Sequence, residues 1–314
     1  MTHDNTHAGK VIDHATGTAK VGHEWDGIEE LDTPLPRWWL WTFYATIVFA
    51  LVYVVLYPAI PMLHSASTGT LGWTSRGALA SDLAHEKAEH QAVRNAIAAT
   101  PIEALAADPA LQRAAIEGGH AAFKVNCVQC HGAGAAGAKG YPNLNDDDWL
   151  WGGDLATIQQ TLINGVRYPG NDQTRTSLMP SFGRDGILTA AQVQDVVSYV
   201  RVLSKQDPAS AGSTRGAQIF ADNCAVCHGA NGEGNRSVGA PRLSDKIWLY
   251  GGDRASLVST VTNAHAGVMP AWTGRLDPVT IKMLAVYVHS LGGGEATPAP
   301  AASAPAAPTA GAAQ

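Results

Sequence analysis

The chain has 314 residues, 46% of them hydrophobic, and its 27 acidic and 21 basic residues give a formal net charge of −6. This acidic balance lacks the excess of Lys and Arg that nucleic-acid binding requires, so we expect no nucleic-acid partner. All four cysteines lie in two Cys-x-x-Cys-His motifs, at residues 127–131 and 224–228, so none remains for a disulfide framework.

The N-terminal segment, residues 1–36, is polar and contains four histidines: His3, His7, His14 and His23. Histidine-rich tracts can bind metal, but the irregular spacing of these histidines favours a solvated tail. We therefore expect no binding site in this segment.

Residues 37–58 are predicted to form one transmembrane helix. Residues 38–57 carry no charge, and 20 residues of helix span about 30 Å, which is the hydrocarbon thickness of a bilayer. Aromatic residues at both ends are typical of the membrane interface. A buried core helix is the alternative, but a helix of this length without a polar stripe is not expected in a chain otherwise built of small domains. A cleaved signal peptide would have a shorter apolar stretch nearer the N-terminus.

Residues 59–112 are predicted to be a partly helical connector. Residues 75–100 have the composition of a polar helix, and a short segment that begins at Pro101 follows it. Nothing in the connector indicates catalytic chemistry.

Each Cys-x-x-Cys-His motif predicts covalent attachment of a haem c, because the two thiols add to the porphyrin and the adjacent histidine coordinates the iron on its proximal side. A zinc site would need the two cysteine pairs to converge, and a thioredoxin-type dithiol would need a βαβ context. Neither alternative requires the histidine. We therefore predict two covalently bound haems c, with thioether bonds and proximal iron ligands provided by Cys127, Cys130, Cys224, Cys227, His131 and His228.

The motifs belong to an internal repeat, since each is followed by a Pro-x-Leu segment, a Trp-Leu-x-Gly-Gly-Asp segment and a Met-Pro pair. A methionine thioether is the usual sixth ligand of an electron-carrying haem. Met179 and Met269 are the predicted distal ligands, because they precede proline at equivalent places in the two repeats. His265, four residues before Met269, is the rival ligand.

Both repeats end in an amphipathic helix. The first has a Thr189-x-x-Gln192 capping box before a stripe of valines, and the second has Asp277 as N-cap with Pro278 as the first helical residue. Each repeat is therefore predicted to be a small all-helical domain around its own haem, at residues 113–206 and 207–292. Two further segments are expected to lack regular structure: residues 167–175, an exposed turn-rich loop, and residues 293–314, a disordered Ala- and Pro-rich tail.

The pattern resembles the membrane-anchored dihaem subunit (CcoP or FixP) of the cbb3-type cytochrome c oxidases. The resemblance covers residues 26–291 and is carried by the acidic stretch that ends in Pro36-Arg37-Trp38-Trp39, by Tyr57-Pro58, by the Gly-Trp-Thr-Ser segment before residue 76, and by both repeats. It implies an all-α fold with one N-terminal transmembrane helix followed by two tandem class I cytochrome c domains. The chain looks like the form of this subunit with a single anchor.

By similarity to class I cytochromes c, the carbonyls of Pro142 and Pro241 are placed to accept hydrogen bonds from the proximal imidazoles. Arg242 is a candidate partner for a haem propionate. Trp149 and Trp248 are further candidates, although packing would explain them equally well. The acidic run at residues 146–148 could steer a basic donor, but a solvated loop is the favoured interpretation.

The resemblance implies a non-catalytic electron-transfer subunit of a proton-pumping oxidase. A soluble or membrane-bound cytochrome c would donate electrons, which would pass through a monohaem subunit to the haem-copper subunit that reduces oxygen. Because c-type haems are attached outside the bacterial cytoplasm, we expect a single-pass protein of the inner membrane with residues 1–36 cytoplasmic and the connector and haem domains periplasmic. The alternatives are a freestanding membrane-tethered dihaem carrier and the cytochrome subunit of a periplasmic dehydrogenase.

Overall fold

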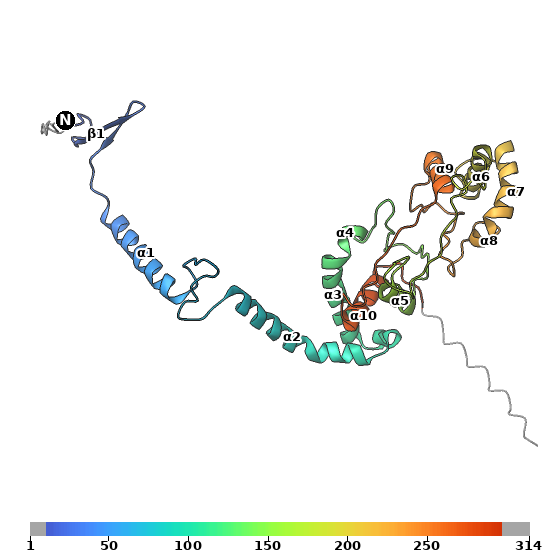
Figure 1. Cartoon of the computed structure of the whole chain (residues 1–314), viewed down its shortest axis with the longest axis horizontal. Helices are drawn as coiled ribbons and strands as arrows, with labels where there is room; N and C mark the ends of the chain where they lie inside the picture. Colours follow the sequence, from blue (N-terminus) through green and yellow to red (C-terminus); the bar gives the residue numbers. More distant parts are fainter. Residues whose placement is uncertain (1–10, 297–314) are drawn as a thin grey trace, which may run out of the picture. The chain divides into compact units, whose positions relative to one another are not determined.

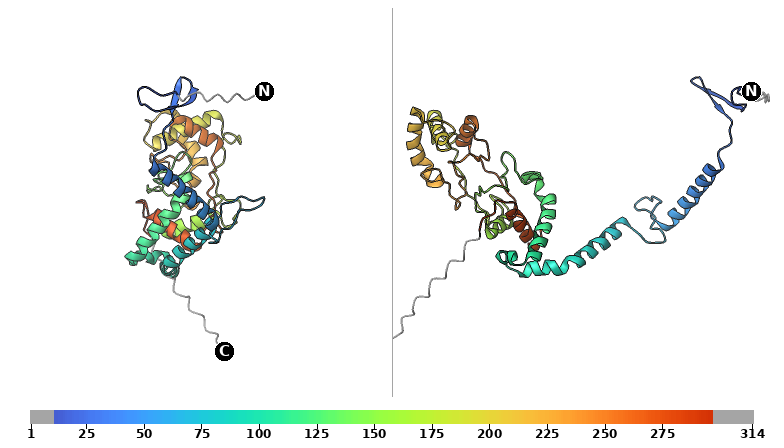
Figure 2. Two further views of the ribbon diagram at one scale, coloured as in Figure 1. Left: turned by 90° about the vertical axis from the view of Figure 1, so that its left-hand side faces the viewer. Right: turned by 180° about the vertical axis from the view of Figure 1, so that it is seen from behind.

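The computed structural model describes residues 11–296, and its internal contacts divide the chain into two units, residues 1–89 and 90–314 (Figures 1 and 2). Helices dominate both units. The described elements, in chain order, are β1 (Lys20–Trp25), β2 (Ile28–Leu31), α1 (Arg37–Leu56), α2 (Ser75–Ala99), the 3₁₀ helix η1 (Ile102–Ala107), α3 (Pro109–Asn126), α4 (Val128–His131), α5 (Leu155–Asn164), α6 (Ala190–Leu203), α7 (Ala211–Asn223), α8 (Ala225–His228), α9 (Arg254–Asn263) and α10 (Pro278–His289).

The first unit contains an antiparallel β-hairpin, β1–β2, where the sequence analysis predicts only a solvated tail. Asp26 and Gly27 form its turn with φ angles of 49° and 83°, and two positive φ angles are what a type I′ hairpin turn requires. The hairpin was not predicted, but most of its residues are exposed, as expected of a solvated segment. His3 and His7 lie outside the described residues.

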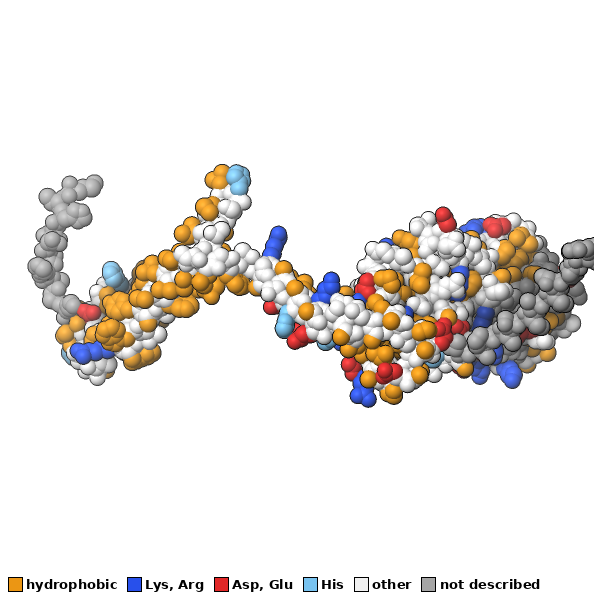
Figure 3. All heavy atoms as spheres, turned by 90° about the horizontal axis from the view of Figure 1, so that it is seen from below, with side chains coloured by type: hydrophobic (Ala, Val, Ile, Leu, Met, Phe, Trp, Pro, Cys, Tyr) orange, Lys and Arg blue, Asp and Glu red, His pale blue; other side chains and the backbone are white. Residues whose placement is uncertain are grey.

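Helix α1, which follows the hairpin, is 20 residues long and has no buried side chain. Hydrophobic atoms cover this helix on the face shown in Figure 3. It is the candidate membrane span among residues 11–296, and it agrees with the predicted transmembrane segment to within two residues.

The second unit contains two hydrophobic cores. The first, which we call core 1, packs α10 against α3 and α5 and includes Phe123 and Cys127. The second, core 2, packs α6 against α7 and α9 and includes Phe220, with Cys224 beside it. The final helix of each repeat therefore packs on the first helix of the other repeat, as the grouping of the labelled helices in Figure 1 shows.

This exchange corrects the prediction that each repeat wraps around its own haem motif. Core 2 draws on one continuous stretch, residues 179–261, whereas core 1 draws on residues 97–163 and 269–291. The chain leaves and re-enters core 1 on adjacent segments, since Val166 and Met269 exchange backbone hydrogen bonds of 2.9 and 3.0 Å. Core 2 is therefore inserted within core 1.

The two helix crossings use the same chemistry. In core 1, Gly119 of α3 lies against the backbone of α10, and Phe123 contacts Tyr287 with ring centroids 5.4 Å apart. In core 2, Gly216 of α7 lies against the backbone of α6, and Phe220 contacts the ring of Tyr199 at 5.2 Å. A side chain at either glycine would collide with a backbone carbonyl, so the close crossing depends on glycine.

The segment predicted as a connector contributes to core 1. Ile97 at the end of α2 and Ile102 and Leu105 of η1 are all buried there. From α10, the ammonium group of Lys282 donates to the carbonyls of Ile97, Ala98 and Thr100 at 2.9–3.0 Å, which satisfies the C-terminal end of α2. Core 1 therefore begins before residue 113.

The predicted helix caps are confirmed. Thr189 and Gln192 form the reciprocal capping box at the start of α6, and Asp277 accepts from the backbone of Val279 and Thr280 at the start of α10. The repeated Gly-Gly-Asp segment has a related role, because Asp154 and Asp253 cap α5 and α9.

The start of the C-terminal tail contacts the first repeat, against the prediction of disorder from residue 293. The Glu295 carboxylate accepts from the backbone N–H of Gly153 at 2.8 Å and pairs with Arg236 at 2.5 Å. The indole N–H of Trp149 donates to the carbonyl of Gly293 at 2.6 Å. The rest of the predicted tail lies outside the described residues.

Candidate functional site

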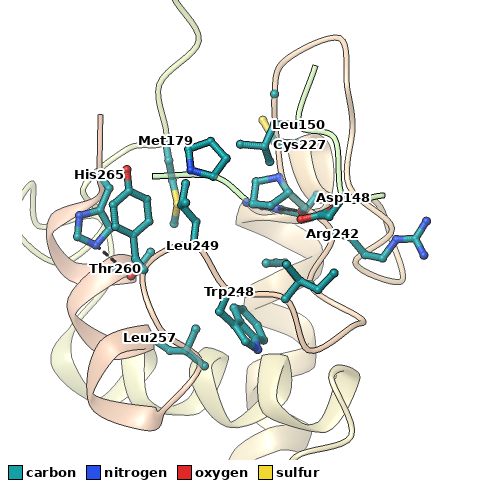
Figure 4. Close-up of a pocket in the computed structure, with 18 of the residues that line it drawn as sticks. Asp148, Leu150, Met179, Cys227, Arg242, Trp248, Leu249, Leu257, Thr260 and His265 are labelled. Carbon is teal, nitrogen blue, oxygen red and sulfur yellow. Dashed lines mark hydrogen bonds between the residues drawn. The ribbon is translucent and has the colours of Figure 1, made fainter. Parts of the chain in front are cut away.

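The second Cys-x-x-Cys-His motif faces a cavity of about 530 Å³, which is within the size range of ligand and cofactor pockets. Figure 4 shows Met179 and Cys227 on this cavity together with Trp248 and Leu257. The remaining walls are largely apolar and include Phe182, Val197, Val200, Leu243 and Val261. Such a cavity suits a large, flat and mostly apolar group.

His228 and His131 occupy equivalent positions at the ends of α8 and α4. The Nδ1 atom of His228 lies 2.9 Å from the carbonyl oxygen of Pro241, and that of His131 lies 3.1 Å from the carbonyl oxygen of Pro142. Since a carbonyl can only accept, Nδ1 carries the proton and Nε2 keeps its lone pair. The expected hydrogen bonds to the two prolines are thus present.

Burial lowers the pKa of both imidazoles, and the hydrogen bond to the proline carbonyl offsets this only in part. Both rings are therefore neutral at pH 7, which is the form that binds iron. His228 is the more enclosed residue, with 8% of its surface exposed.

The two cysteines of each motif have different environments. Cys127 is buried and Cys224 is half-buried, whereas Cys130 and Cys227 are exposed. Burial, followed by the neighbouring thiol, raises the pKa of Cys127 and of Cys224 to about 11. Each motif thus places one thiol inside the core and one at its surface, so the pair could hold a group that lies at the edge of the core.

The two candidate methionines lie with the motif of the other repeat. Met179 lines the cavity of His228 and packs on core 2, while Met269 packs on core 1, which contains Cys127. The exchange of helices explains this placement, because each methionine shortly precedes the helix that is exchanged. The structure therefore places Met179 on the same cavity as His228, and it places Met269 against core 1, which contains Cys127 of the first motif.

The rival ligand His265 lines the same cavity as Met179 but is engaged elsewhere. Its ring stacks on Tyr250 with centroids 3.9 Å apart, and its Nε2 lies 3.1 Å from the hydroxyl oxygen of Thr260 (Figure 4). These contacts hold the His265 side chain in the cavity wall, so its presence there does not require a role as iron ligand.

One wall of this cavity comes from the loop that follows the first motif. Tyr141, Pro142 and Asn143 line the cavity, and Pro142 is also the residue that accepts the hydrogen bond of His131. The backbone N–H of Gly140 donates to the carbonyl of Leu249 at 2.8 Å and fixes this loop against the second repeat. A single short loop therefore borders both motifs.

The predicted propionate partners have mixed outcomes. Arg242 and Trp248 both line the cavity. The indole N–H of Trp149 instead donates to the backbone carbonyl of Gly293. Each tryptophan ring also covers the second glycine of its Gly-Gly-Asp segment, where a Cβ on Gly153 or Gly252 would lie within 2.3 Å of the ring. Packing therefore accounts for both tryptophans.

The acidic run is not uniformly solvated. Asp147 is exposed, but Asp148 is half-buried on the cavity wall. Burial, together with the nearby carboxylates of Asp245 and Asp146, raises the pKa of Asp148 to about 6, although Arg242 opposes the shift. The prediction of a solvated loop thus holds for Asp147 and is wrong for Asp146 and Asp148, which are both half-buried on the cavity wall.

The sequence analysis missed Arg167, which it places in an exposed loop. The side chain is half-buried on the cavity wall, and its Nε donates to the carbonyl of Gly267 at 2.7 Å. A second donor of the guanidinium reaches the carbonyl of Ser177 at 3.1 Å. No motif marks this residue, because one of the carbonyls that it binds lies ten residues further along the chain and the other lies 100 residues away.

Together, the paired motifs, the apolar cavity and the apolar helix define a membrane-anchored c-type cytochrome. A family model described as the N-terminal domain of cytochrome oxidase-cbb3, FixP, matches residues 17–64, and one described as cytochrome c oxidase, cbb3-type, subunit III matches residues 114–200 and 211–288. The chain belongs to this family of cbb3-type oxidase subunits, CcoP and FixP.

Relatives with these names match most of the chain. The CcoP subunit of the cbb3-type oxidase of Cereibacter sphaeroides is 54% identical over 88% of this chain and 95% of its own length. FixP subunits of Bradyrhizobium sp. (strain ORS 278) and Azorhizobium caulinodans are 54% and 51% identical, over 90% and 94% of this chain and 98% and 99% of their own lengths. The predicted fold, a membrane helix followed by tandem cytochrome c domains along the sequence, is confirmed, as is haem c binding.

Proposed function

We propose that the chain carries two covalently bound haems c with exchanged distal ligands. Cys127, Cys130 and His131 would hold the first haem with Met269, and the second motif would hold the other with Met179. The observation that carries this assignment is that each methionine packs with the motif of the other repeat.

The residues present fit the group. Two thiols, an imidazole whose Nε2 is free and a thioether are the donor set of a His/Met haem c, and the second motif also faces an apolar cavity. When bound, such a haem supplies reversible one-electron transfer. The proline carbonyls hold each imidazole in one tautomer and orientation, and the apolar walls exclude water.

We further propose that this subunit accepts electrons from a periplasmic cytochrome c and passes them, through a monohaem subunit, to the haem-copper subunit that reduces oxygen and pumps protons. The loop that borders both motifs supports two successive electron carriers within one chain. The apolar helix α1 supports a single-pass membrane anchor. We place it in the bacterial inner membrane with a cytoplasmic N-terminus and periplasmic haem domains, because c-type haems are attached outside the cytoplasm. The two alternatives, a freestanding carrier and a dehydrogenase subunit, are disfavoured by membership of the oxidase family.

Purification of the tagged chain in mild detergent tests the oxidase assignment. We expect a haem-copper subunit and a monohaem cytochrome to co-elute, and the preparation to consume oxygen when reduced cytochrome c is added. A chain that elutes alone, or with a dehydrogenase, would contradict the proposal.

The exchange of ligands has its own test in chains that keep one haem. Replacing both cysteines of the first motif by serine leaves only the haem at Cys224 and Cys227. In that background we expect Met179→Ala to abolish the iron–thioether absorption band and Met269→Ala to leave it intact. If Met269→Ala abolished the band and Met179→Ala left it intact, each haem would instead be ligated by the methionine of its own repeat.

A further inference from the structure

Arg167 lies where the two methionine-bearing segments meet. It follows α5 after two residues, and its backbone N–H donates to the carbonyl of Arg175 at 2.7 Å. Its own φ is 50°, a left-handed conformation that is unfavourable for a residue with a Cβ. The surrounding structure must therefore hold Arg167 in this conformation.

The guanidinium binds the two segments at equivalent places. Gly267, whose carbonyl accepts from Nε, lies two residues before Met269, and Ser177, whose carbonyl accepts from a terminal nitrogen, lies two residues before Met179. A rigid planar guanidinium fixes both acceptors relative to each other better than a flexible ammonium group would. One side chain thus sets the relative position of both methionine segments.

The charge on Arg167 is not neutralised by a carboxylate. Within residues 11–296 the guanidinium makes no ion pair, and its hydrogen-bond acceptors are neutral carbonyls. A half-buried positive charge disfavours loss of an electron from a nearby redox group, and the low dielectric of the interior strengthens this effect. The second repeat has Ala266 at the position that corresponds to Arg167, so this charge has no duplicate.

We propose that Arg167 is a positioning residue for both distal methionines and that its charge raises the reduction potentials of both haems. The proposal rests on the proposed ligation by Met179 and Met269. It assigns to one residue a control over two redox centres that belong to different cores.

The test uses the purified holo-oxidase with Arg167→Gln, which removes the charge and the planar fork, and Arg167→Lys, which keeps the charge. We expect Arg167→Gln to weaken the iron–thioether bands of both haems and to lower both midpoint potentials in a redox titration. Arg167→Lys should keep the potentials closer to those of the wild type while the bands still weaken. Bound haem is measured in each preparation, so that ligation and potential are compared per haem.

Arg175→Gln is the matched control. The side chain of Arg175 is also half-buried in the same loop, but it contacts Thr161, Gln160 and the ring of Trp151, and it does not contact Ser177 or Gly267. The backbone carbonyl of Arg175, which accepts from the N–H of Arg167, is unchanged by the substitution. We expect this variant to keep both bands.

Three results would overturn the proposal: unchanged bands and potentials in Arg167→Gln, a change confined to one haem, or the same loss of both bands in Arg175→Gln. If Arg167→Gln fails to retain haem, the lysine variant decides, since wild-type bands and potentials there would also overturn the positioning role. Failure of the ligation itself is recognised separately, because Met179→Ala and Met269→Ala would then leave both bands in place.

Discussion

The two cores of the haem-binding unit are built from the same parts but differ in their path through the chain. Core 2 is continuous, over residues 179–261, whereas core 1 is assembled from two pieces that flank it. Core 1 also recruits the end of α2 and η1, for which core 2 has no counterpart among the described residues. The unit that is repeated in the sequence is therefore not the unit that packs.

The largest expected effect comes from expressing fragments of the chain. One fragment follows the boundaries of a packed core, and the other follows the boundaries of a sequence repeat. A fragment of residues 176–266 contains every described part of core 2, so it should fold and bind one haem with methionine ligation. A fragment of residues 113–206, the first repeat alone, separates α3 from α10 and can form a helix crossing only between α3 and α6, so it should be less stable than the 176–266 fragment. Thermal unfolding of both fragments after haem attachment, followed by circular dichroism, checks this, and a first repeat at least as stable as the 176–266 fragment would contradict the prediction.

A smaller effect is expected at the helix crossing of core 1. In Gly119→Ala the new Cβ would lie 2.2 Å from the carbonyl oxygen of Met283, whereas in Gly118→Ala it would meet only the flexible side chain of Met283. We expect Gly119→Ala to lower the free energy of unfolding by about 1–3 kcal/mol and Gly118→Ala by less.

Hydrogen exchange locates the damage in these two variants. Amide protection should fall in α10, which contacts Gly119, and not in α6, which is the last helix of the same repeat. Loss of protection in α6 instead would show that the repeats pack within themselves.

The smallest expected effect is the pH dependence of Asp148, a residue of the first repeat on the cavity of the second motif. Its pKa is raised from 3.8 to about 6, so the folded protein favours the protonated carboxyl. The resulting stabilisation is present below about pH 4 and is lost as the pH rises through 6. Asp148→Asn should therefore raise the melting temperature at pH 8 and have little effect at pH 4, while the exposed Asp147→Asn should change neither.

The sequence was informative where the signal is local. The capping box at Thr189, the cap at Asp277, and the hydrogen bonds from His131 and His228 to prolines all depend on residues close in the chain. The turn at Asp26-Gly27 was readable in the same way, but the surrounding polar composition concealed it.

The exchange of helices could not be predicted from the repeat pattern. Each repeat offers a glycine and a phenylalanine on its first helix and a tyrosine on its last, so pairing within a repeat and between repeats satisfies the same local requirements. Arg167 and Glu295 were missed for a related reason, since their partners are carbonyls, amides and side chains of distant loops.

The insertion of core 2 within core 1 determines the order in which the two cores can be completed as the chain is synthesised. A chain made from its N-terminus exposes Cys127 and Cys130 long before α10, the helix that completes their core, has been translated. Core 2 has all its helices once residue 263 has emerged. The motif that appears first is thus the last to have its core completed.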